Sequence, residues 1–273
     1  MIKNRIITLI VLLFFACTSF LVASEDGVKV KARQAGEYVI VDGINKNPFS
    51  ITVSYGASYV NLTSNIELPL LFVLKPFSKK EILKLHIDKN KFSFKADYDW
   101  TIGSKDAEHD KNYVYRFPYK LGTKEMVSQG FNGKFSHYGK SQYAVDFNMK
   151  EGTGVYAARE GVVVQTKSDS NIGGVNRSFE KHANYVTIEH SDGTLATYSH
   201  LKQKGVVVKV GDKVQKGELL GYSGKTGYSQ GPHLHFIVYK ATDGKGRESI
   251  PVKFMSVKGV VVKVIKNQWY IAK

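Results

Sequence analysis

The sequence predicts a mostly β protein built from two domains. Glycine and β-branched residues are abundant, sustained helical periodicity is hard to find, and short apolar runs recur between turn signals such as Asp192-Gly193 and Gly211-Asp212. In several of these runs apolar and polar residues alternate. Because successive side chains of a strand point to opposite faces, this alternation indicates strands with one buried face.

The first domain is expected to be a small β-sandwich over residues 25–118. Leu83, Leu85 and Ile87 alternate with polar residues, and Phe92 and Phe94 continue the pattern. Further runs of strand character lie at residues 51–55, 68–74 and 113–117. Many short strands separated by turns are typical of two packed sheets.

The second domain is expected at residues 119–273, after a change to polar and glycine-containing sequence near Pro118. Its predicted strands are residues 143–147, 161–165, 185–189, 195–200, 206–210, 219–222 and 233–239. Residues 257–272 also have strand character, and the sequence leaves open whether they pack on this domain.

The first 24 residues have the pattern of a secretory signal peptide. Lys3 and Arg5 precede an apolar run at residues 6–15, and smaller residues follow up to Ser24. A permanent membrane anchor is an alternative, but this run is shorter than the roughly 20 apolar residues that a bilayer requires. A lipid anchor at Cys17 is a further alternative. We therefore expect an exported protein without a stable membrane span, in the periplasm or cell envelope, or secreted.

Cys17 is the only cysteine, and it lies in the segment that signal cleavage removes. The mature chain then has no thiolate for metal binding or for nucleophilic catalysis. Any metal site must therefore be built from histidine, aspartate or glutamate.

Basic residues outnumber acidic ones by 39 to 24, which gives a formal net charge of +15. Such an excess attracts polyanions. For an exported protein these are wall polymers or anionic lipid head groups rather than nucleic acid, and no nucleic-acid-binding module is recognisable. Scattered lysines that solvate a β-rich surface explain the charge at least as well, so charge alone assigns no partner.

His233 and His235 are the clearest chemical signal. On a strand, residues two apart point to the same face, so both imidazoles can address one point. Asp146 lies between apolar neighbours, and a carboxylate on a buried strand requires a partner or a metal. A turn aspartate that accepts backbone hydrogen bonds is the alternative. His137 upstream and His200 at a strand end add two more candidates.

These residues belong to a series of ordered segments that resembles the lysostaphin-type family of zinc peptidoglycan endopeptidases. The similar stretch runs from about residue 127 to residue 254, nearly half of the chain. Its segments are QGFNGKFSH (129–137), GTGVYAAREGVVV (152–164), HSDGT (190–194), YSHL (198–201), GYSGKTG (221–227) and GPHLHF (231–236). The resemblance implies an open antiparallel sheet with one zinc ion in a long groove.

The same resemblance implies a role for each candidate. It assigns His137, Asp146 and His235 as zinc ligands, and His200 and His233 as the two non-ligand histidines beside the bound water. The interval between the first two ligands is longer than the His-x-x-x-Asp spacing often found in the family. We interpret it as a longer loop before the strand of Asp146.

Two histidines and one carboxylate leave a fourth position open on tetrahedral zinc, as a catalytic site requires. Zinc lowers the pKa of bound water towards about 7. A neutral histidine can then take a proton, and a protonated one can stabilise the oxyanion or help the leaving amine. The sequence does not divide these roles between His200 and His233. Tyr228 is a candidate for lining a peptide-binding cleft, and a plain surface tyrosine is the alternative.

The sequence therefore predicts metal-assisted hydrolysis of an amide in a peptidoglycan stem peptide or crosslink. The alternatives are a regulatory module of the same fold, a swinging-arm carrier suggested by residues 205–227, and a basic nucleic-acid binder. The first domain is expected to position the enzyme on the wall or to cover the groove, and a regulatory partner is left open.

The remaining histidines are expected to have structural or surface positions. His190 opens a turn and is expected to form a structural hydrogen bond there. His86, His109 and His182 are expected at the surface.

Overall fold

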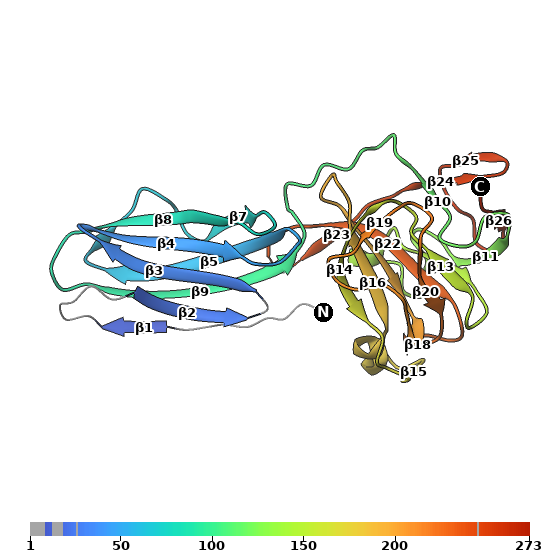
Figure 1. Ribbon diagram of the computed structural model, residues 1–273, viewed down its shortest axis with the longest axis horizontal. Helices are drawn as coiled ribbons and strands as arrows, with labels where there is room; N and C mark the ends of the chain where they lie inside the picture. The colour runs from blue at the N-terminus through green and yellow to red at the C-terminus, as the bar shows by residue number, and fades with distance from the viewer. Residues whose placement is uncertain (1–8, 13–18, 26, 245) are drawn as a thin grey trace. The chain divides into compact units, whose positions relative to one another are not determined.

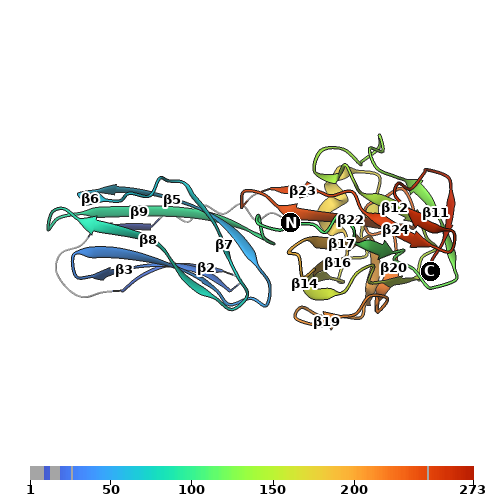
Figure 2. The same cartoon turned by 90° about the horizontal axis from the view of Figure 1, so that it is seen from above.

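The computed structural model describes residues 9–12, 19–25, 27–244 and 246–273. The chain forms two compact units (Figures 1 and 2), Met1–Asp106 with Ala241–Gly246, and Ala107–Lys240 with Arg247–Lys273. The sequence placed the boundary after Pro118, whereas this division falls before Ala107. Tyr115 and Phe117 are fully buried in the core of the second unit. Apolar packing therefore joins the segment before Pro118 to that unit.

The first unit consists of two antiparallel sheets, with strand orders β1-β9-β5-β7 and β2-β3-β4-β8-β6. Their bounds are β1 Leu9–Leu12, β2 Ser19–Glu25, β3 Val28–Ala35, β4 Tyr38–Asn45, β5 Ile51–Val60, β6 Leu62–Thr63, β7 Leu70–Leu74, β8 Lys79–Ile87 and β9 Ser93–Ile102. A Cβ on Gly43 of β4 would meet Leu74 and Phe72 of β7 at 3.2 and 3.3 Å. The sheets thus face each other here, which is compatible with the expected β-sandwich.

Strand β1 and all of β2 except Glu25 fall within the predicted signal segment. β1 pairs with β9, and β2 pairs with β3. The basic residues Lys3 and Arg5 and the cysteine Cys17 lie outside the described residues, so export through a cleaved signal stays a prediction. Within the described part of the chain, no helix has the length and apolar character needed to cross a membrane.

The second unit is built on a nine-stranded sheet whose path is β19-β14-β16-β17-β22-β12-β11-β26, with β23 paired to β22. The bounds are β11 Lys124–Gln129, β12 Val145–Asn148, β14 Gly161–Lys167, β16 Tyr185–Glu189, β17 Leu195–Ser199, β19 Lys213–Val214, β22 Leu234–Ala241, β23 Arg247–Ser249 and β26 Trp269–Ile271. The pairings along this path are antiparallel. The mostly β, antiparallel fold that the sequence predicted is therefore confirmed.

Smaller sheets accompany this one, with orders β13-β20-β18, β10-β24-β25 and β15-β21. Their bounds are β10 Val114–Arg116, β13 Gly154–Tyr156, β15 Gly173–Gly174, β18 Leu201–Val206, β20 Leu219–Ser223, β21 Gly227–Tyr228, β24 Lys253–Ser256 and β25 Gly259–Val261. Two 3-10 helices, η1 Gly139–Ser141 and η2 Arg177–His182, lie in the connections.

The strand predicted at residues 206–210 is wrong. β18 ends at Val206, and Val207 and Val210 beyond it are exposed. A valine-rich run favours a strand, but it forms one only where a neighbouring strand is available to pair with it. The C-terminal stretch does find such neighbours, because β25 pairs with β24 and β26 pairs with β11. It therefore packs on the second unit.

An aromatic cluster packs behind the central strands. The rings of Phe117 and Phe254 stack with centroids 4.8 Å apart, and Phe254 meets Phe147 and Phe236 at 6.1 and 5.8 Å. All four side chains are buried. Phe147 lies on β12 and Phe236 on β22, so the residues before them along each strand leave the sheet on the opposite face.

A polar network lies at the end of β16, where the chain turns towards β17. Nδ1 of the buried His190 is 2.7 Å from the carbonyl oxygen of Glu160, and its Nε2 has no hydrogen-bond partner among the described residues. The structural role expected for His190 is thus confirmed. Arg159 donates to Asp192 at 2.6 Å, and Nδ1 of His109 is 3.7 Å from the same carboxylate. The surface position predicted for His109 is wrong, because its side chain packs against Asp192 and is only 11% exposed.

His190 is expected to make the second unit less stable in acid. Burial lowers its pKa from 6.5 to about 4. The folded protein therefore favours neutral His190, and this contribution is complete above about pH 6.5 and is lost as the pH falls towards 4. We expect it to remove about 2 kcal/mol from the free energy of unfolding between about pH 7 and pH 5.

Urea unfolding of the metal-free full chain at several pH values measures this effect. His190→Asn, which keeps a donor near the position of Nδ1, should show a shallower pH dependence than the wild type. His86→Asn, at an exposed position, is the control and should follow the wild type. Equal pH dependence in His190→Asn and the wild type would contradict the prediction.

Candidate metal centre

Two neighbouring strands place Asp146 and His235 side by side. β12 and β22 pair with Asp146 opposite His235, and β17 pairs with β22 so that Ser199 is opposite His235 on its other side. His200 follows β17 with a φ of 66°, a left-handed conformation that is uncommon outside glycine. This turn leaves the rings of His200 and His235 with centroids 5.8 Å apart.

His137 comes from the loop between β11 and β12. The chain from His137 to Asp146 contains η1, so a 3-10 turn takes up part of the long interval between the two residues. The backbone N–H of His137 donates to the carbonyl of Gly133, and Nδ1 of its ring lies 2.9 Å from the carbonyl oxygen of Gly130. The loop therefore holds the fully buried imidazole by both its backbone and its ring.

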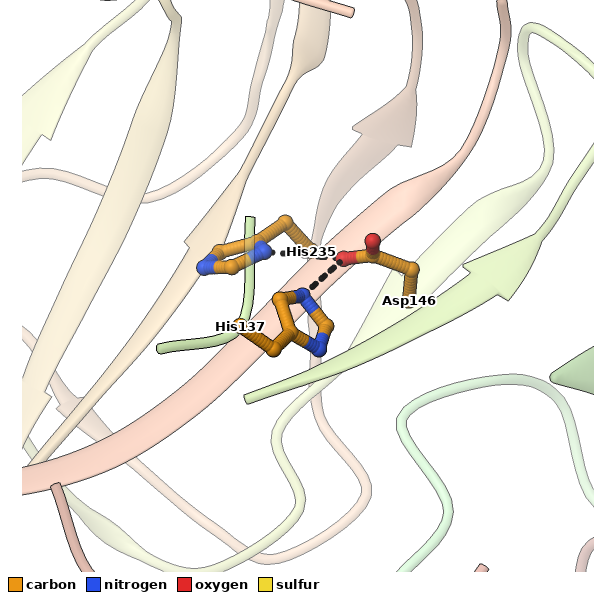
Figure 3. Close-up of side chains that lie close together, drawn as sticks. All are labelled: His137, Asp146 and His235. Atoms are coloured by element: carbon orange, nitrogen blue, oxygen red, sulfur yellow. Dashed lines mark hydrogen bonds and ion pairs between the residues drawn. The ribbon is translucent and has the colours of Figure 1, made fainter. Parts of the chain in front are cut away.

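Figure 3 shows His137, Asp146 and His235 converging from these three segments. Nε2 of His137 lies 3.1 Å from Oδ1 of Asp146, and Nδ1 of His235 lies 2.8 Å from the same oxygen. One ligand atom from each residue lies within 4.8 Å of the other two. The three side chains expected as metal ligands are thus brought together within the described part of the chain.

The positions of the protons favour a cation at this point. A carbonyl oxygen only accepts hydrogen bonds, so the contact with Gly130 places the proton of neutral His137 on Nδ1 and leaves a lone pair on Nε2. This Nε2 is buried, has no hydrogen-bond partner in the described part of the chain and lies 3.1 Å from a carboxylate oxygen of Asp146. Two electron-rich atoms at this distance repel each other unless a cation lies between them. Two imidazoles and one carboxylate are the donor set of a catalytic zinc site.

The protonation states suit metal binding. Burial alone would raise the pKa of Asp146, but the neighbouring imidazoles of His137 and His235 hold it well below its usual range. Burial lowers the pKa of His235. Burial, together with the adjacent His233 and His235, lowers the pKa of His200 to about 3. An ionised carboxylate and neutral imidazoles are the forms that bind a divalent metal.

His200 and His233 both present an unprotonated nitrogen. Nδ1 of His200 is 2.6 Å from the carbonyl oxygen of Thr226, and Nδ1 of His233 is 2.9 Å from that of Gly231. Each Nδ1 therefore carries the proton, and each Nε2 keeps its lone pair. The two ring centroids are 4.5 Å apart, and Nε2 of His233 is 4.0 Å from Oδ1 of Asp146. The pair offers two proton acceptors beside the ligand cluster.

Gln129 orients the carboxylate of Asp146, a role that the sequence analysis did not assign. Its Nε2 donates to Oδ2 of Asp146 at 3.0 Å and to Oγ of Ser136 at 2.8 Å. Its Oε1 accepts the backbone N–H of Phe135 at 3.0 Å. A Cβ on Gly133 would lie 2.2 Å from Cγ of Gln129, so the glycine at this position makes room for the buried amide.

A register irregularity in β11 explains why the alternation of its side chains did not indicate that Gln129 contacts Asp146. Simple alternation places Gln129 on the same face as the core residue Val127. The pairing of β11 with β12 shifts between these two residues, so that Gln129 comes to lie opposite Asp146. Such a β-bulge re-aims a side chain, and the sequence carries no clear signal for it.

Tyr228 lies in β21, beside the candidate catalytic histidines. The next residue, Ser229, has its Oγ 3.2 Å from Nδ1 of His233. The half-buried ring of Tyr228 stacks on Phe135 with centroids 5.3 Å apart and an angle of 18° between the planes. Phe135 precedes His137 by two residues. This aromatic pair therefore lies close along the chain both to a candidate ligand, His137, and to Ser229, the partner of His233.

Residues 140–249 match Peptidase family M23. The peptidoglycan DD-endopeptidase ShyA of Vibrio cholerae is 35% identical over 122 residues, covering 43% of this chain and 26% of that protein. Lysostaphin of Staphylococcus simulans is 40% identical over 152 residues, covering 55% and 26%. The glycyl-glycine endopeptidase ALE-1 of Staphylococcus capitis is 35% identical over 152 residues, covering 55% and 35%. The match therefore spans between 26% and 35% of the length of these relatives.

Solved structures of two catalytic domains also align with part of this chain. The catalytic domain of lysostaphin from Staphylococcus simulans aligns with a TM-score of 0.33 and 29% identity, over 46% of this chain and 87% of that one. The catalytic domain of EnpA from Enterococcus faecalis aligns with a TM-score of 0.37 and 25% identity, over 49% and 93%.

Gln129→Leu is expected to weaken zinc binding by roughly 10- to 100-fold, because Oδ2 of Asp146 loses its donor and the carboxylate its fixed orientation. Competition for Zn²⁺ with a chromogenic chelator measures the affinity. Gln142→Leu is the matched control, since Gln142 lies in the same loop and donates to Asn132 instead. An unchanged affinity in Gln129→Leu would show that this amide does not support the site.

Proposed function

We propose that the protein is an exported zinc metalloendopeptidase of peptidoglycan, on the basis of the match between residues 140–249 and Peptidase family M23. It hydrolyses peptide bonds in stem peptides or in the crosslinks between them. The observation that carries the proposal is the convergence of Nε2 of His137, Oδ1 of Asp146 and Nδ1 of His235. Two of the relatives named above support the substrate class, since one is by name a peptidoglycan DD-endopeptidase and the other a glycyl-glycine endopeptidase.

His137, Asp146 and His235 would hold one zinc ion, and their number leaves a position for the reacting water. Zinc in such a site lowers the pKa of water towards about 7 and polarises a carbonyl group. Structural zinc sites, in contrast, are usually closed by four protein ligands. The donor set of this chain therefore favours catalysis over a purely structural metal.

Nε2 of His200 and Nε2 of His233 are the atoms that move the proton. One accepts a proton from the attacking water as general base, and a protonated imidazole stabilises the oxyanion or delivers a proton to the leaving amine. The carbonyl groups of Thr226 and Gly231 keep each Nδ1 protonated and each ring in place. Because the two histidines make the same kind of hydrogen bond, either one can be the general base while the other stabilises the oxyanion or protonates the leaving amine.

Export rests on the basic start and apolar run of residues 1–24, and the net charge of +15 suits attraction to anionic wall polymers. For the first unit we propose a role in positioning the enzyme on the wall or in restricting access to the site. Its place ahead of the catalytic unit is the basis for this role.

Zinc-loaded mature protein is expected to release new peptide ends from purified peptidoglycan, which mass spectrometry identifies. A chelator and His235→Ala are each expected to abolish the release, because both remove the metal from the remaining ligands. Re-addition of zinc should restore the chelated wild type but not the variant. Intact peptidoglycan despite bound zinc would contradict the proposed reaction and favour a regulatory module of the same fold.

His200→Ala and His233→Ala are each expected to slow the digestion by roughly 10²- to 10⁴-fold while zinc stays bound, since proton transfer contributes about this factor. Zinc content is measured by atomic emission on the same samples as the rate. His182→Ala, at the end of η2, serves as the control and should keep the wild-type rate. Full activity in either of the first two variants would remove that histidine from the mechanism.

A further inference from the structure

Arg177 is held by aromatic side chains beside the metal centre. It is the first residue of η2, in the connection between β14 and β16. Its guanidinium carbon lies 5.7 Å from the ring centroid of Tyr138 and 5.7 Å from that of Tyr228, and its Nη2 donates to the hydroxyl of Tyr138. A cation over two aromatic faces is attracted by both.

These rings come from the two segments that carry the site. Tyr138 directly follows His137, and Tyr228 precedes Ser229, whose Oγ contacts His233. Consecutive Cα atoms are about 3.8 Å apart. Tyr138 is therefore next to a candidate metal ligand, and Tyr228 is next to the serine that contacts a candidate catalytic histidine. Stacking of Phe135 on Tyr228 adds a third ring from the same loop as His137.

The charge of Arg177 has no counter-ion among the residues that the structure describes. Arg33 and Arg159 pair with the carboxylates of Asp42 and Asp192 at 3.3 and 2.6 Å. Arg177 forms no ion pair with any carboxylate among the described residues, Glu180 of the same 3-10 helix included. The side chain is exposed, and the bond to Tyr138 uses one of the five N–H donors of a guanidinium.

A guanidinium that is fixed in position, exposed and without a counter-ion is suited to bind a carboxylate through two parallel hydrogen bonds. Its rings restrict the side chain before a ligand arrives, so less rotamer entropy is lost on binding. A planar, bidentate site also selects a carboxylate over a neutral amide, because the amide offers only one acceptor and no charge.

We propose that Arg177 binds a free carboxylate of the peptide substrate and thereby selects stem peptides that carry one near the cleaved bond. This inference rests on the proposed function and adds to it a specificity-determining residue and the chemical group that it recognises. Tyr138, Tyr228 and Phe135 act as positioning residues for the guanidinium. A stem peptide offers two sources of this group, an internal carboxylate of its acidic residue and the carboxylate at its C-terminus.

Synthetic crosslinked stem peptides test the proposal in three forms, with both carboxylates free, with the internal one as a methylamide, and with the terminal one as a methylamide. Affinities are measured by calorimetry on zinc-loaded full-length chain carrying His200→Ala, so that binding is read without turnover. Rates are measured in parallel on chain with His200 intact. Each measurement is repeated with Arg177→Gln, Arg177→Lys and the matched control Arg247→Gln, since Arg247 also lies over a tyrosine ring, that of Tyr239.

We expect one of the two methylamides to bind about 10- to 100-fold more weakly than the free peptide, the range for a charge-assisted hydrogen bond. Arg177→Gln should lower the affinity for the free peptide by the same factor. This variant should then bind the free peptide and that methylamide with equal affinity. Arg177→Lys should recover part of the preference, and Arg247→Gln should leave it intact. The methylamide that matters identifies the carboxylate.

Equal affinity of the wild type for all three peptides, or no measurable binding of any of them, would overturn the proposal. So would an Arg177→Gln variant that loses the same factor on free and blocked peptides, because this would indicate a general effect on the site. A failure of the proposed function gives a different result from a failure of this inference. If wild-type chain cleaves none of the peptides but binds them with the expected preference, Arg177 recognises the carboxylate in a protein that is not this enzyme.

Discussion

Asp146 places a carboxylate on the open face of a sheet whose other face is packed with aromatic rings. An ionised carboxylate in such a buried position is strongly unfavourable unless it is surrounded by donors or a cation. Gln129 donates a hydrogen bond to it from a neighbouring strand. Nε2 of His137 and Nδ1 of His235 approach it from a loop and a second strand, as ligand atoms for such a cation. The segments that carry these three residues therefore all contact Asp146. The position of Asp146 is in turn set by the next residue of its strand, Phe147, which is buried in the core.

A second constraint recurs in the histidines. His137, His200 and His233 each use Nδ1 to bond a backbone carbonyl, of Gly130, Thr226 and Gly231. Because a carbonyl only accepts, the loops that provide these oxygens also decide which nitrogen carries the proton. His235 differs, since it turns Nδ1 towards Asp146. Loop conformation and acid–base chemistry are therefore coupled, and a change in the glycine-rich turns before His233 would alter the tautomers as well as the shape of the site.

The two ends of the central strands are used differently. At one end of β16 and β17, Arg159, His190 and Asp192 form a buried network that anchors the segment before Tyr115. At the other end lie His200 and the aromatic residues that hold Arg177. In the first set Arg159 pairs with Asp192. In the second set the guanidinium of Arg177 has no counter-ion within the described ranges of the chain. Stability and substrate recognition are thus separated along the same strands.

The sequence by itself determined the features that depend on local periodicity. Alternation located most strands, the two-residue spacing placed His233 and His235 on one face, and the segments from Gln129 to Phe236 indicated the family and the candidate ligands. Only the tertiary structure decided features that depend on pairing between distant residues. The bulge before Gln129 reversed the face that alternation gives, and the strand predicted at residues 206–210 ended at Val206. The segment around Tyr115 joined the second unit through its buried rings. Arg177 meets Tyr138 and Tyr228 across long stretches of chain. Their contact follows from how three connections meet in space, which no pattern of spacing along one of them encodes.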